Sequence, residues 1–328
     1  MYMRPSIILP GMGKTNRNQP KNAKSSDATT TVFDFEQRFP DDSACLDELV
    51  RMLYPDGIYC PKDKRVTKHH RLKNRPAYAC QYCGHHEYPM KGTIFEGSST
   101  SLKLWFQAIY LMASTRCGIS AKQLEREIGV SYPTALRMFR QIRSLLDQGD
   151  DLLSGTVEAD ETYIGGKLRA SERVRPGAMP KWQARQEAAK RGLAKKQTVA
   201  GIAQRKGKVT AVVVPDSRAE TLVPFVKTKV LPASVVYTDE WNAYGRLGKE
   251  GFEHSRVNHS ERIYVDGDVH TNTIEGFWAL LKNGLRGVYH SVSDRHLQSY
   301  VDEYVFRYNN RDEPGGMFNA FLGRIEKV

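Results

Sequence analysis

The order of strand-like and helix-like segments in the second half of the chain limits the folds that it can adopt. Runs rich in Val, Ala and Thr are typical of strands, and they lie at 156–164, 198–204, 208–214 and 234–239. Segments with helical periodicity lie at 219–230, 272–284 and 295–309. Three strands, a helix, a strand and then helices predict an α/β domain whose mixed sheet is covered by helices.

The chain has 328 residues, which is enough for about two domains of ordinary size and a tail. We expect a disordered tail over 1–30, because this segment is rich in Asn, Lys, Ser, Thr and Pro. Residues 31–100 combine a helical lead with a segment punctuated by Cys, Gly and Pro, and a helical region follows over 101–150. The α/β domain covers 151–328, with a basic insert at 167–196 between its first two strands.

The charge balance favours a polyanionic partner. The chain carries 49 Lys and Arg against 37 Asp and Glu, a formal net charge of +12. Basic residues gather at 61–75 and in the insert at 167–196. We interpret these patches as surfaces for nucleic acid; the alternative is a pair of solvated surface loops. The insert is a candidate DNA clamp on its charge alone.

The five cysteines all fall between residues 45 and 117, and an odd number in this pattern does not resemble a secreted disulfide framework. No apolar stretch reaches the roughly 18 residues needed to span a bilayer. We therefore expect a cytoplasmic protein without a membrane partner.

Two short turns offer metal ligands. Cys80 and Cys83 form a Cys-x-x-Cys knuckle, and Cys60 is followed three residues later by Asp63 where a zinc site would place a fourth cysteine. The other candidates for the fourth ligand are His69, His70, His85 and His86. A zinc-ribbon-like module is the first interpretation, and a metal-free ribbon held by its small core is the second.

Residues 118–138 have the residue pattern of a helix-turn-helix. Ser120 and Ser131 can cap two helices that are separated by a turn at Gly129. The second helix also carries basic side chains that we expect to point toward DNA phosphates or base edges: Arg137, Arg140 and Arg143. An ordinary helical hairpin is the alternative.

Three carboxylates lie on separate predicted elements of the α/β domain. Asp160 is on its first strand, Asp239 ends the buried strand, and Glu275 is on a later helix. Asn272 and Lys282 share the helix face of Glu275. Such an arrangement is that of a ribonuclease-H-like nuclease, in which two Mg²⁺ ions roughly 4 Å apart serve phosphoryl transfer. Lys282 would contact a DNA phosphate beside the ions.

Neighbouring acids compete for these roles. Glu158 and Asp160 share one face of the first strand, whereas Glu161 points to the other. Glu240 follows Asp239 directly. The alternative is that all of these carboxylates are ordinary surface charges with no catalytic role.

At these residues the chain closely resembles the ISXO-type insertion-sequence transposases, which carry a zinc ribbon ahead of a DDE catalytic domain. The resemblance extends over about residues 33–312, and its motifs are long and specific in the catalytic domain. The motifs that carry it are 38–42, 54–57, 92–95, 118–124, 157–167, 237–239, 270–278 and 306–311.

The resemblance implies a bacterial, nucleoid-associated enzyme that binds terminal inverted repeats, cleaves strands and joins them to target DNA with Mg²⁺, for which Mn²⁺ can substitute. Asp160 and Asp239 match the first two catalytic acids. Glu275 and Asn272 are both candidates for the third, and Glu275 is favoured because a carboxylate binds a hard cation better. Asp63 departs from the first Cys-x-x-Cys pair of the family. Pairing two element ends implies a homo-oligomer on DNA.

Two other functions remain open on the sequence. A non-catalytic DNA-binding regulator would keep the ribbon and the helices, although the intact acidic set argues against it. A ribonuclease-H-like nuclease acting on RNA or branched DNA would keep the carboxylates.

Overall fold

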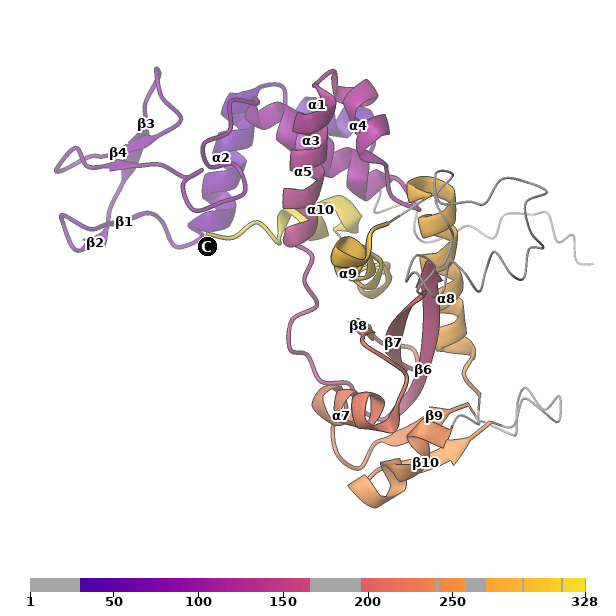
Figure 1. Cartoon of the computed structure of the whole chain (residues 1–328). Coiled ribbons are helices and arrows are strands. Elements are labelled where there is room, and N and C mark those ends of the chain that lie inside the picture. Colours follow the sequence, from indigo (N-terminus) through magenta and orange to yellow (C-terminus); the bar gives the residue numbers. More distant parts are fainter. Residues whose placement is uncertain are drawn as a thin grey trace, which may run out of the picture.

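The computed structural model of the protein describes residues 30–165, 196–239, 242–257, 270–290, 292–313 and 315–327. A small ribbon of short strands, a layer of helices and a five-stranded sheet with its own helices follow one another in space (Figure 1). The expected tail and almost all of the basic insert lie outside the described residues, and so does Glu240.

The sheet is mixed, and its strands follow the predicted order. Its strands are β6 (Thr156–Gly165), β7 (Lys196–Gln204), β8 (Val209–Val214), β9 (Val235–Thr238) and β10 (Glu253–Arg256). They are arranged β10-β9-β6-β7-β8. β6, β7 and β8 pair antiparallel, whereas β9 pairs parallel with both β6 and β10. Strand β10 is an addition that the sequence did not predict.

Helices cover both faces of this sheet. The helical elements of the domain are α7 (Ala219–Lys229), the 3-10 helix η3 (Asn242–Glu250), α8 (Asn272–Gly284), the π-helix η5 (Leu285–Tyr289), the 3-10 helix η6 (Asp294–His296) and α9 (Leu297–Asn309). Side chains of α7 and η3 share one core with Val157 and Ala159 of β6. Side chains of α8 and α9 share the other core with Val199 and Ala203 of β7. Alternation along the strands therefore decides which side chains meet α8.

The layer of helices joins segments from both ends of the chain. Its helices are α1 (Val32–Arg38), α2 (Asp42–Leu53), α3 (Leu102–Ser114), α4 (Ala121–Ile128), α5 (Tyr132–Ser144) and α10 (Gly316–Leu322). Phe318 and Phe321 of α10 pack in the same core as Phe35 and Trp105. The division expected at residue 150 therefore separates segments that one core unites, because α10 completes the helical layer and not the α/β domain.

The ribbon consists of very short strands. They are β1 (Tyr59–Cys60), β2 (Arg65–Val66), β3 (His69–Arg71), β4 (Tyr78–Cys80) and β5 (His86–Glu87). They form a two-stranded and a three-stranded sheet, both antiparallel. In Figure 1 the ribbon lies at the opposite end of the molecule from the five-stranded sheet.

The outer edge of β8 is covered by side-chain amides. Gln148 pairs with the backbone of Ala211, Gln298 with Val213 N–H, and Asn309 with both backbone groups of Val209. An edge strand with free backbone groups is a template for pairing with another chain. Here the linker after α5 and helix α9 occupy that edge, which fixes the helical layer against the sheet.

Candidate active site and metal centre

The strand register brings two of the predicted acids side by side. In the parallel pair of β6 and β9, Ala159 lies opposite Thr238. The next residues along the chain are Asp160, in β6, and Asp239, which directly follows the end of β9, so the two are level at neighbouring strands about 4.8 Å apart. Alternation turns both carboxylates to the sheet face that α8 covers.

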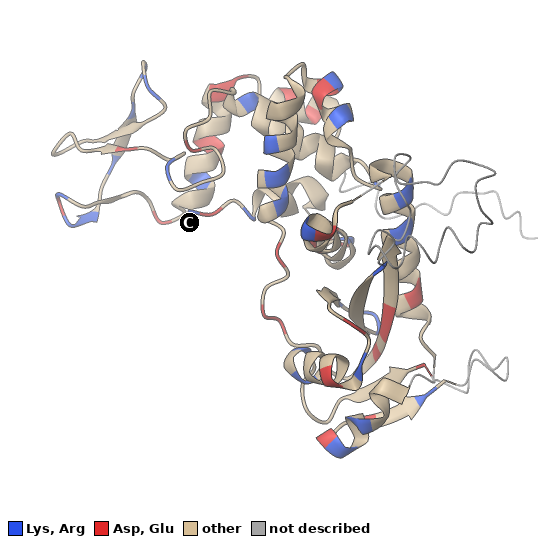
Figure 2. Ribbon diagram, in the orientation of Figure 1, with Lys and Arg blue, Asp and Glu red and all other residues tan. Residues whose placement is uncertain are grey.

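Helix α8 brings further predicted residues to the same place. The indole Nε1 of Trp278 donates a hydrogen bond of 2.9 Å to Oδ2 of Asp160. Glu275 lies one turn before Trp278, and its Oε1 accepts a hydrogen bond of 3.0 Å from Thr271. Lys282 lies one turn after Trp278; burial and the charge of Arg286 lower its pKa, and the negative charge of Asp160 acts in the opposite direction. Red segments on β6 and α8, followed by blue ones farther along α8, show this order in Figure 2.

The carboxylates interact electrostatically. Burial raises the pKa of Asp160 to about 6, and the negative charges of Asp239 and Glu275 add to the rise. The hydrogen bond from Trp278 acts in the opposite direction. Like charges gathered at a partly buried point repel one another unless a cation neutralises them. Three carboxylates from separate elements are a donor set that suits Mg²⁺.

The three acids are spread more widely than the ligands of one tetrahedral ion. Among the described residues, only one group of three or more His, Cys, Asp or Glu side chains has ligand atoms that all lie within 4.8 Å of one another, and that group belongs to the ribbon. A pair of ions about 4 Å apart spans a wider set of carboxylates than a single ion does. Asn272 is the first residue of α8 and is exposed, one turn before Glu275.

The neighbouring acids Glu158 and Glu161 contact other partners than Asp160, Asp239 and Glu275 do. Glu158 is fully buried, and its Oε2 accepts hydrogen bonds from the backbone N–H groups of Thr273 (2.7 Å) and Ile274 (3.1 Å). Arg205 donates to its Oε1 at 3.0 Å. Glu158 therefore caps the N-terminus of α8, where a negative charge is favourable. This contact joins α8 to β6 and so fixes the position of Glu275 along the strand.

Glu161 points to the opposite face of the sheet. Its Oε2 accepts a hydrogen bond of 3.0 Å from the hydroxyl of Tyr244 in η3. Burial raises the pKa of Glu161 to about 7, and the charge of Asp160 adds to the rise. Glu161 is thus a half-buried acid beside the site but on the side of the sheet that α8 does not cover.

We expect Mg²⁺ to stabilise the protein at about pH 8 and not at about pH 5. Folding raises the pKa of Asp160 from 3.8 to about 6. Protonation of Asp160 therefore stabilises the folded state fully below pH 3.8, and this stabilisation is lost as the pH rises through 6. Above that pH the ionised carboxylate can bind a cation. Thermal unfolding with and without Mg²⁺ should show a rise of a few degrees at the higher pH alone, and an equal rise at both would contradict the assignment.

Two of the predicted DNA-binding arginines are exposed, and the third is not. Arg137 and Arg140 are exposed on α5, and Arg137 donates a hydrogen bond to Ser98 Oγ at 3.3 Å. Arg143 was expected on the same DNA-facing surface, and this expectation is wrong. Its side chain is only 3% exposed and pairs with Glu303 of α9 at 2.7 Å.

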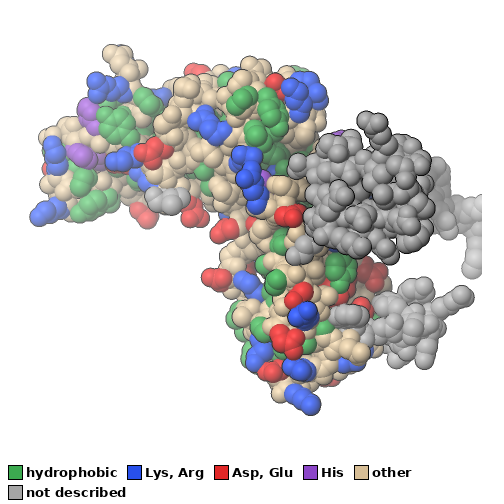
Figure 3. All heavy atoms as spheres, in the orientation of Figure 1, with side chains coloured by type: hydrophobic (Ala, Val, Ile, Leu, Met, Phe, Trp, Pro, Cys, Tyr) green, Lys and Arg blue, Asp and Glu red, His purple; other side chains and the backbone are tan. Residues whose placement is uncertain are grey.

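Basic side chains near Arg137 extend this surface toward the ribbon. Ser98, which Arg137 contacts, lines a cavity of about 400 Å³ together with Lys73 and Arg75 of the loop between β3 and β4. Figure 3 shows Lys and Arg side chains spread over the ribbon and the helical layer on the face that it presents.

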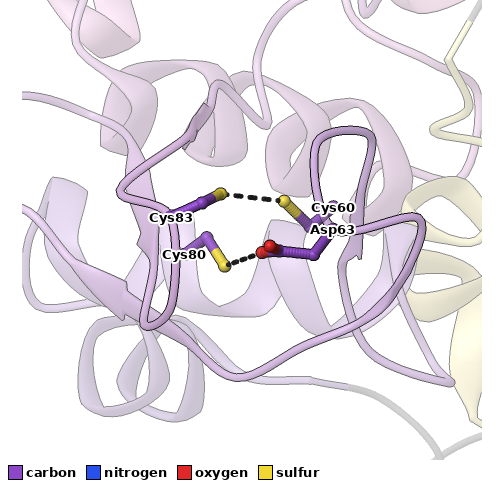
Figure 4. A group of neighbouring side chains, drawn as sticks. All are labelled: Cys60, Asp63, Cys80 and Cys83. Atoms are coloured by element: carbon purple, nitrogen blue, oxygen red, sulfur yellow. Dashed lines mark hydrogen bonds between the residues drawn. The ribbon is translucent and has the colours of Figure 1, made fainter.

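The four predicted ribbon ligands converge. Ligand atoms of Cys60, Asp63, Cys80 and Cys83 all lie within 4.8 Å of one another. The thiol sulfurs of Cys60 and Cys83 are 3.4 Å from each other, and the thiol of Cys80 is 3.0 Å from Oδ2 of Asp63. Figure 4 shows the four side chains pointing toward one another. Hydrogen bonds from Cys80, Cys83 and Cys60 hold the pKa of Asp63 below its ordinary value. His69 instead has its Nδ1 at 2.9 Å from the carbonyl oxygen of Thr67.

The two knuckles have the same backbone form. In each, the residue after the second ligand is left-handed: Lys64 with φ 54° after Asp63, and Gly84 with φ 68° after Cys83. Asp63 therefore occupies the place of a second cysteine. Three sulfurs and one carboxylate oxygen make a donor set that fits Zn²⁺.

Three residues at the site were not predicted. Trp278 could have been found, because it lies on the helix face of Glu275 and Lys282. Arg286, one turn beyond Lys282, has its charge close enough to lower the pKa of Lys282, an effect second to burial. Arg205 holds Glu158 across 47 residues of sequence, and no local pattern marks it.

Comparisons with known proteins identify the family. The profile of the ISXO2-like transposase domain matches residues 152–309. A Halobacterium salinarum protein described as an uncharacterized protein in transposable element ISH50 is 28% identical over 282 residues, which are 81% of this chain and 90% of that protein. A Haemophilus influenzae protein described as an uncharacterized transposase-like protein is 36% identical over 107 residues, 33% of this chain and 85% of that protein. The chain therefore belongs to the ISXO-type transposases of insertion sequences.

Proposed function

We propose that the protein is a DNA transposase that binds the inverted repeats of its insertion sequence and catalyses strand cleavage and strand transfer. The observation that carries this proposal is the strand register that sets Asp160 level with Asp239, together with the Trp278 contact that brings the helix of Glu275 to Asp160. Family membership supplies the substrate class. Because two ends of an element must be paired, the active form on DNA is a homo-oligomer. No helix among the described residues is both long and apolar enough to cross a membrane.

The sheet order supports a ribonuclease-H-like catalytic domain. If β6 to β10 are numbered 1 to 5 along the chain, their order across the sheet is 3-2-1-4-5. The first three strands pair antiparallel, and the fourth is parallel to the first. The central strand β6 and its parallel neighbour β9 then supply one carboxylate each, and a covering helix supplies the third. Asp160 and Glu275 lie within regular elements and Asp239 directly follows β9, so rigid elements hold or adjoin all three groups.

Each residue has a distinct task in the proposed reaction. Asp160, Asp239 and Glu275 would hold two Mg²⁺ ions, which when bound activate water or a 3′-hydroxyl and stabilise the leaving 3′-oxygen. Asn272, one turn before Glu275, would assist with its amide oxygen. Lys282 would bind the phosphate next to the scissile bond, because it lies one turn beyond Trp278, whose indole contacts Asp160.

The function is tested by the substrate that the protein cuts. Purified protein is incubated with Mg²⁺ and three nucleic acids: a duplex from the DNA that flanks the gene, an unrelated duplex and an RNA–DNA hybrid. We expect cleavage of the flanking duplex at the element end. Binding without cleavage would identify a regulator, and preferential cleavage of the hybrid would identify another nuclease; either result overturns the proposal.

Substituting the exposed arginines of α5 should weaken DNA binding. We expect Arg137→Ala and Arg140→Ala each to reduce affinity for duplex DNA and to lower the salt slope by about one, since each removes one phosphate contact. Fluorescence anisotropy at several salt concentrations measures both quantities. Lys249→Ala in η3 is the control, because that exposed residue lies away from the helical layer. An unchanged salt slope in both arginine variants would exclude α5 from the DNA interface.

Removing zinc should unfold the ribbon and leave the rest folded. We propose that Cys60, Asp63, Cys80 and Cys83 hold one Zn²⁺, and metal analysis of the purified protein should give about one zinc per chain. A chelator is then expected to release the metal and weaken DNA binding. Asp63→Cys should bind zinc more tightly, because a soft thiolate replaces a carboxylate. A chain purified without zinc, with the same DNA affinity before and after zinc addition, would favour the metal-free ribbon.

A further inference from the structure

Trp278 lies where α8 meets the centre of the sheet. Its side chain is 4% exposed, and its indole N–H donates to Oδ2 of Asp160 at 2.9 Å. It follows Glu275 by three residues and precedes Lys282 by four, so it shares their face of α8. The indole is thus a direct contact between the helix that carries Glu275 and the carboxylate of Asp160, in addition to the cap that Glu158 forms.

Gly201 makes the space for this ring. It lies directly opposite Asp160 in the antiparallel pairing of β6 and β7. A Cβ at position 201 would stand 2.5 Å from Cη2 and 2.7 Å from Cζ2 of Trp278, closer than carbon atoms pack. Glycine weakens the interior of a strand and often marks a close approach by another group. Here the approaching group is the indole on its way to Asp160.

The choice of acceptor is informative. A buried indole N–H needs a hydrogen-bond partner, but a backbone carbonyl or a hydroxyl would satisfy it equally well. Trp105, the other tryptophan that the structure describes, uses the hydroxyl of Ser98 at 2.9 Å. At Trp278 the acceptor is instead a carboxylate that faces two other acids. Outer hydrogen bonds of this kind orient the carboxylates that bind metals.

We propose that Trp278 is the positioning residue for Asp160, and that Gly201 is what allows it to reach that carboxylate. The indole N–H holds one oxygen of Asp160, which stops the carboxylate from rotating and presents it toward Asp239 and Glu275. The inference rests on the proposed function, because it takes Asp160 to be a metal ligand. It adds a residue that touches neither the metal nor the DNA.

Mn²⁺ binding provides a readout that does not depend on DNA cleavage. Trp278→Phe keeps a buried aromatic ring and removes the N–H, whereas Gly201→Ala keeps the N–H and displaces the ring. At about pH 8, where Asp160 is ionised, we expect each variant to bind Mn²⁺ about 10- to 100-fold more weakly than the wild type. The free Mn²⁺ is measured by electron paramagnetic resonance. Wild-type affinity in Trp278→Phe would overturn the proposal.

Matched controls separate positioning from packing. Trp105→Phe removes the same kind of buried hydrogen bond in the helical layer and should leave Mn²⁺ affinity unchanged. Gly248→Ala adds a Cβ that meets nothing within 4 Å and should also be neutral. If Asp160→Asn binds Mn²⁺ as the wild type does, the proposed metal site itself is wrong. If Asp160→Asn is the one variant that weakens Mn²⁺ binding, the proposed metal site is supported and the proposed role of Trp278 is wrong.

A measurement on the wild type covers the case in which a variant does not fold. In a ¹⁵N-labelled sample, the indole N–H of Trp278 should shift when Mg²⁺ is added, because its acceptor then binds the metal, and that of Trp105 should not. The chain has four tryptophans, and replacing each in turn with Phe assigns the signals, the last by elimination. A Trp278 signal that stays in place while Mg²⁺ binds would contradict the inference.

Discussion

Asp160→Asn is expected to abolish DNA cleavage while leaving the protein folded and, without metal, more stable than the wild type. We expect the cleavage rate to fall on the order of 10³-fold or more, about 4 kcal/mol of activation free energy. The amide has the size of the carboxylate and can still accept the hydrogen bond of Trp278, but it carries no charge for a metal ion. Gel assays of strand cleavage measure the rate, and thermal unfolding measures the stability.

The rise in stability follows from the pKa of Asp160. That pKa is raised to about 6 by burial and by Asp239 and Glu275, so at about pH 8 the folded wild type holds an ionised carboxylate that the fold disfavours. The asparagine variant has no such charge. Loss of cleavage accompanied by loss of stability would indicate damage to the fold and not removal of a metal ligand.

Glu161→Gln is the matched control. Glu161 is the next residue and is also a half-buried acid with a raised pKa, but it faces Tyr244 on the other side of the sheet. We expect this variant to cleave at a rate close to that of the wild type. Cleavage retained in Asp160→Asn and lost in Glu161→Gln would assign the chemistry to the opposite face of β6.

The second large effect concerns stability. Glu303→Gln is expected to lower the free energy of unfolding by about 3 to 5 kcal/mol, because it leaves two buried guanidinium groups without a counter-charge. Glu303 is fully buried between Arg143 of α5, at 2.7 Å, and Arg307, at 2.8 Å. Arg307 also donates hydrogen bonds to the carbonyl oxygens of Met112 and Thr115 at the end of α3. Denaturant unfolding measures the loss.

Glu48→Gln provides the comparison at the surface. Glu48 also pairs with two arginines, Arg38 at 2.6 Å and Arg51 at 2.5 Å, but these side chains are 35% and 68% exposed. Water and salt screen such pairs, so we expect a loss of about 1 kcal/mol or less. Equal losses in the two variants would show that the buried cluster is no more important than a surface pair.

The buried cluster also fixes how the two parts of the molecule meet. Arg143 comes from the helical layer and Glu303 from the α/β domain, and Phe139, Tyr289 and Tyr300 surround the guanidinium of Arg143. We therefore expect Glu303→Gln to loosen the junction between the helical layer and the five-stranded sheet. Hydrogen exchange of α5 and α9 amides, which pack against each other, should rise more than exchange in α7.

The local sequence pattern determined the regular elements and the positions of the acids on them. The strands expected at 156–164 and 208–214 appear as β6 and β8 within a residue or two, and the helix expected at 272–284 is α8 with the same bounds. These predictions succeeded because β-branched runs and helical periodicity reflect neighbours along the chain. The identity of Asp63 as a fourth ribbon ligand was open on the sequence, and the matching turns at Lys64 and Gly84 support it.

Only the tertiary structure decided which charges face inward and what each one meets. Arg143 was expected on the DNA surface because an arginine on a helix is usually exposed, yet its partner Glu303 lies 160 residues away and draws it into the core. Glu158 lies 115 residues from the helix end that it caps, and Trp278 lies 118 residues from Asp160. A buried charge or donor is stable only beside its partner, and long-range packing, which local sequence does not encode, is what brings the two together.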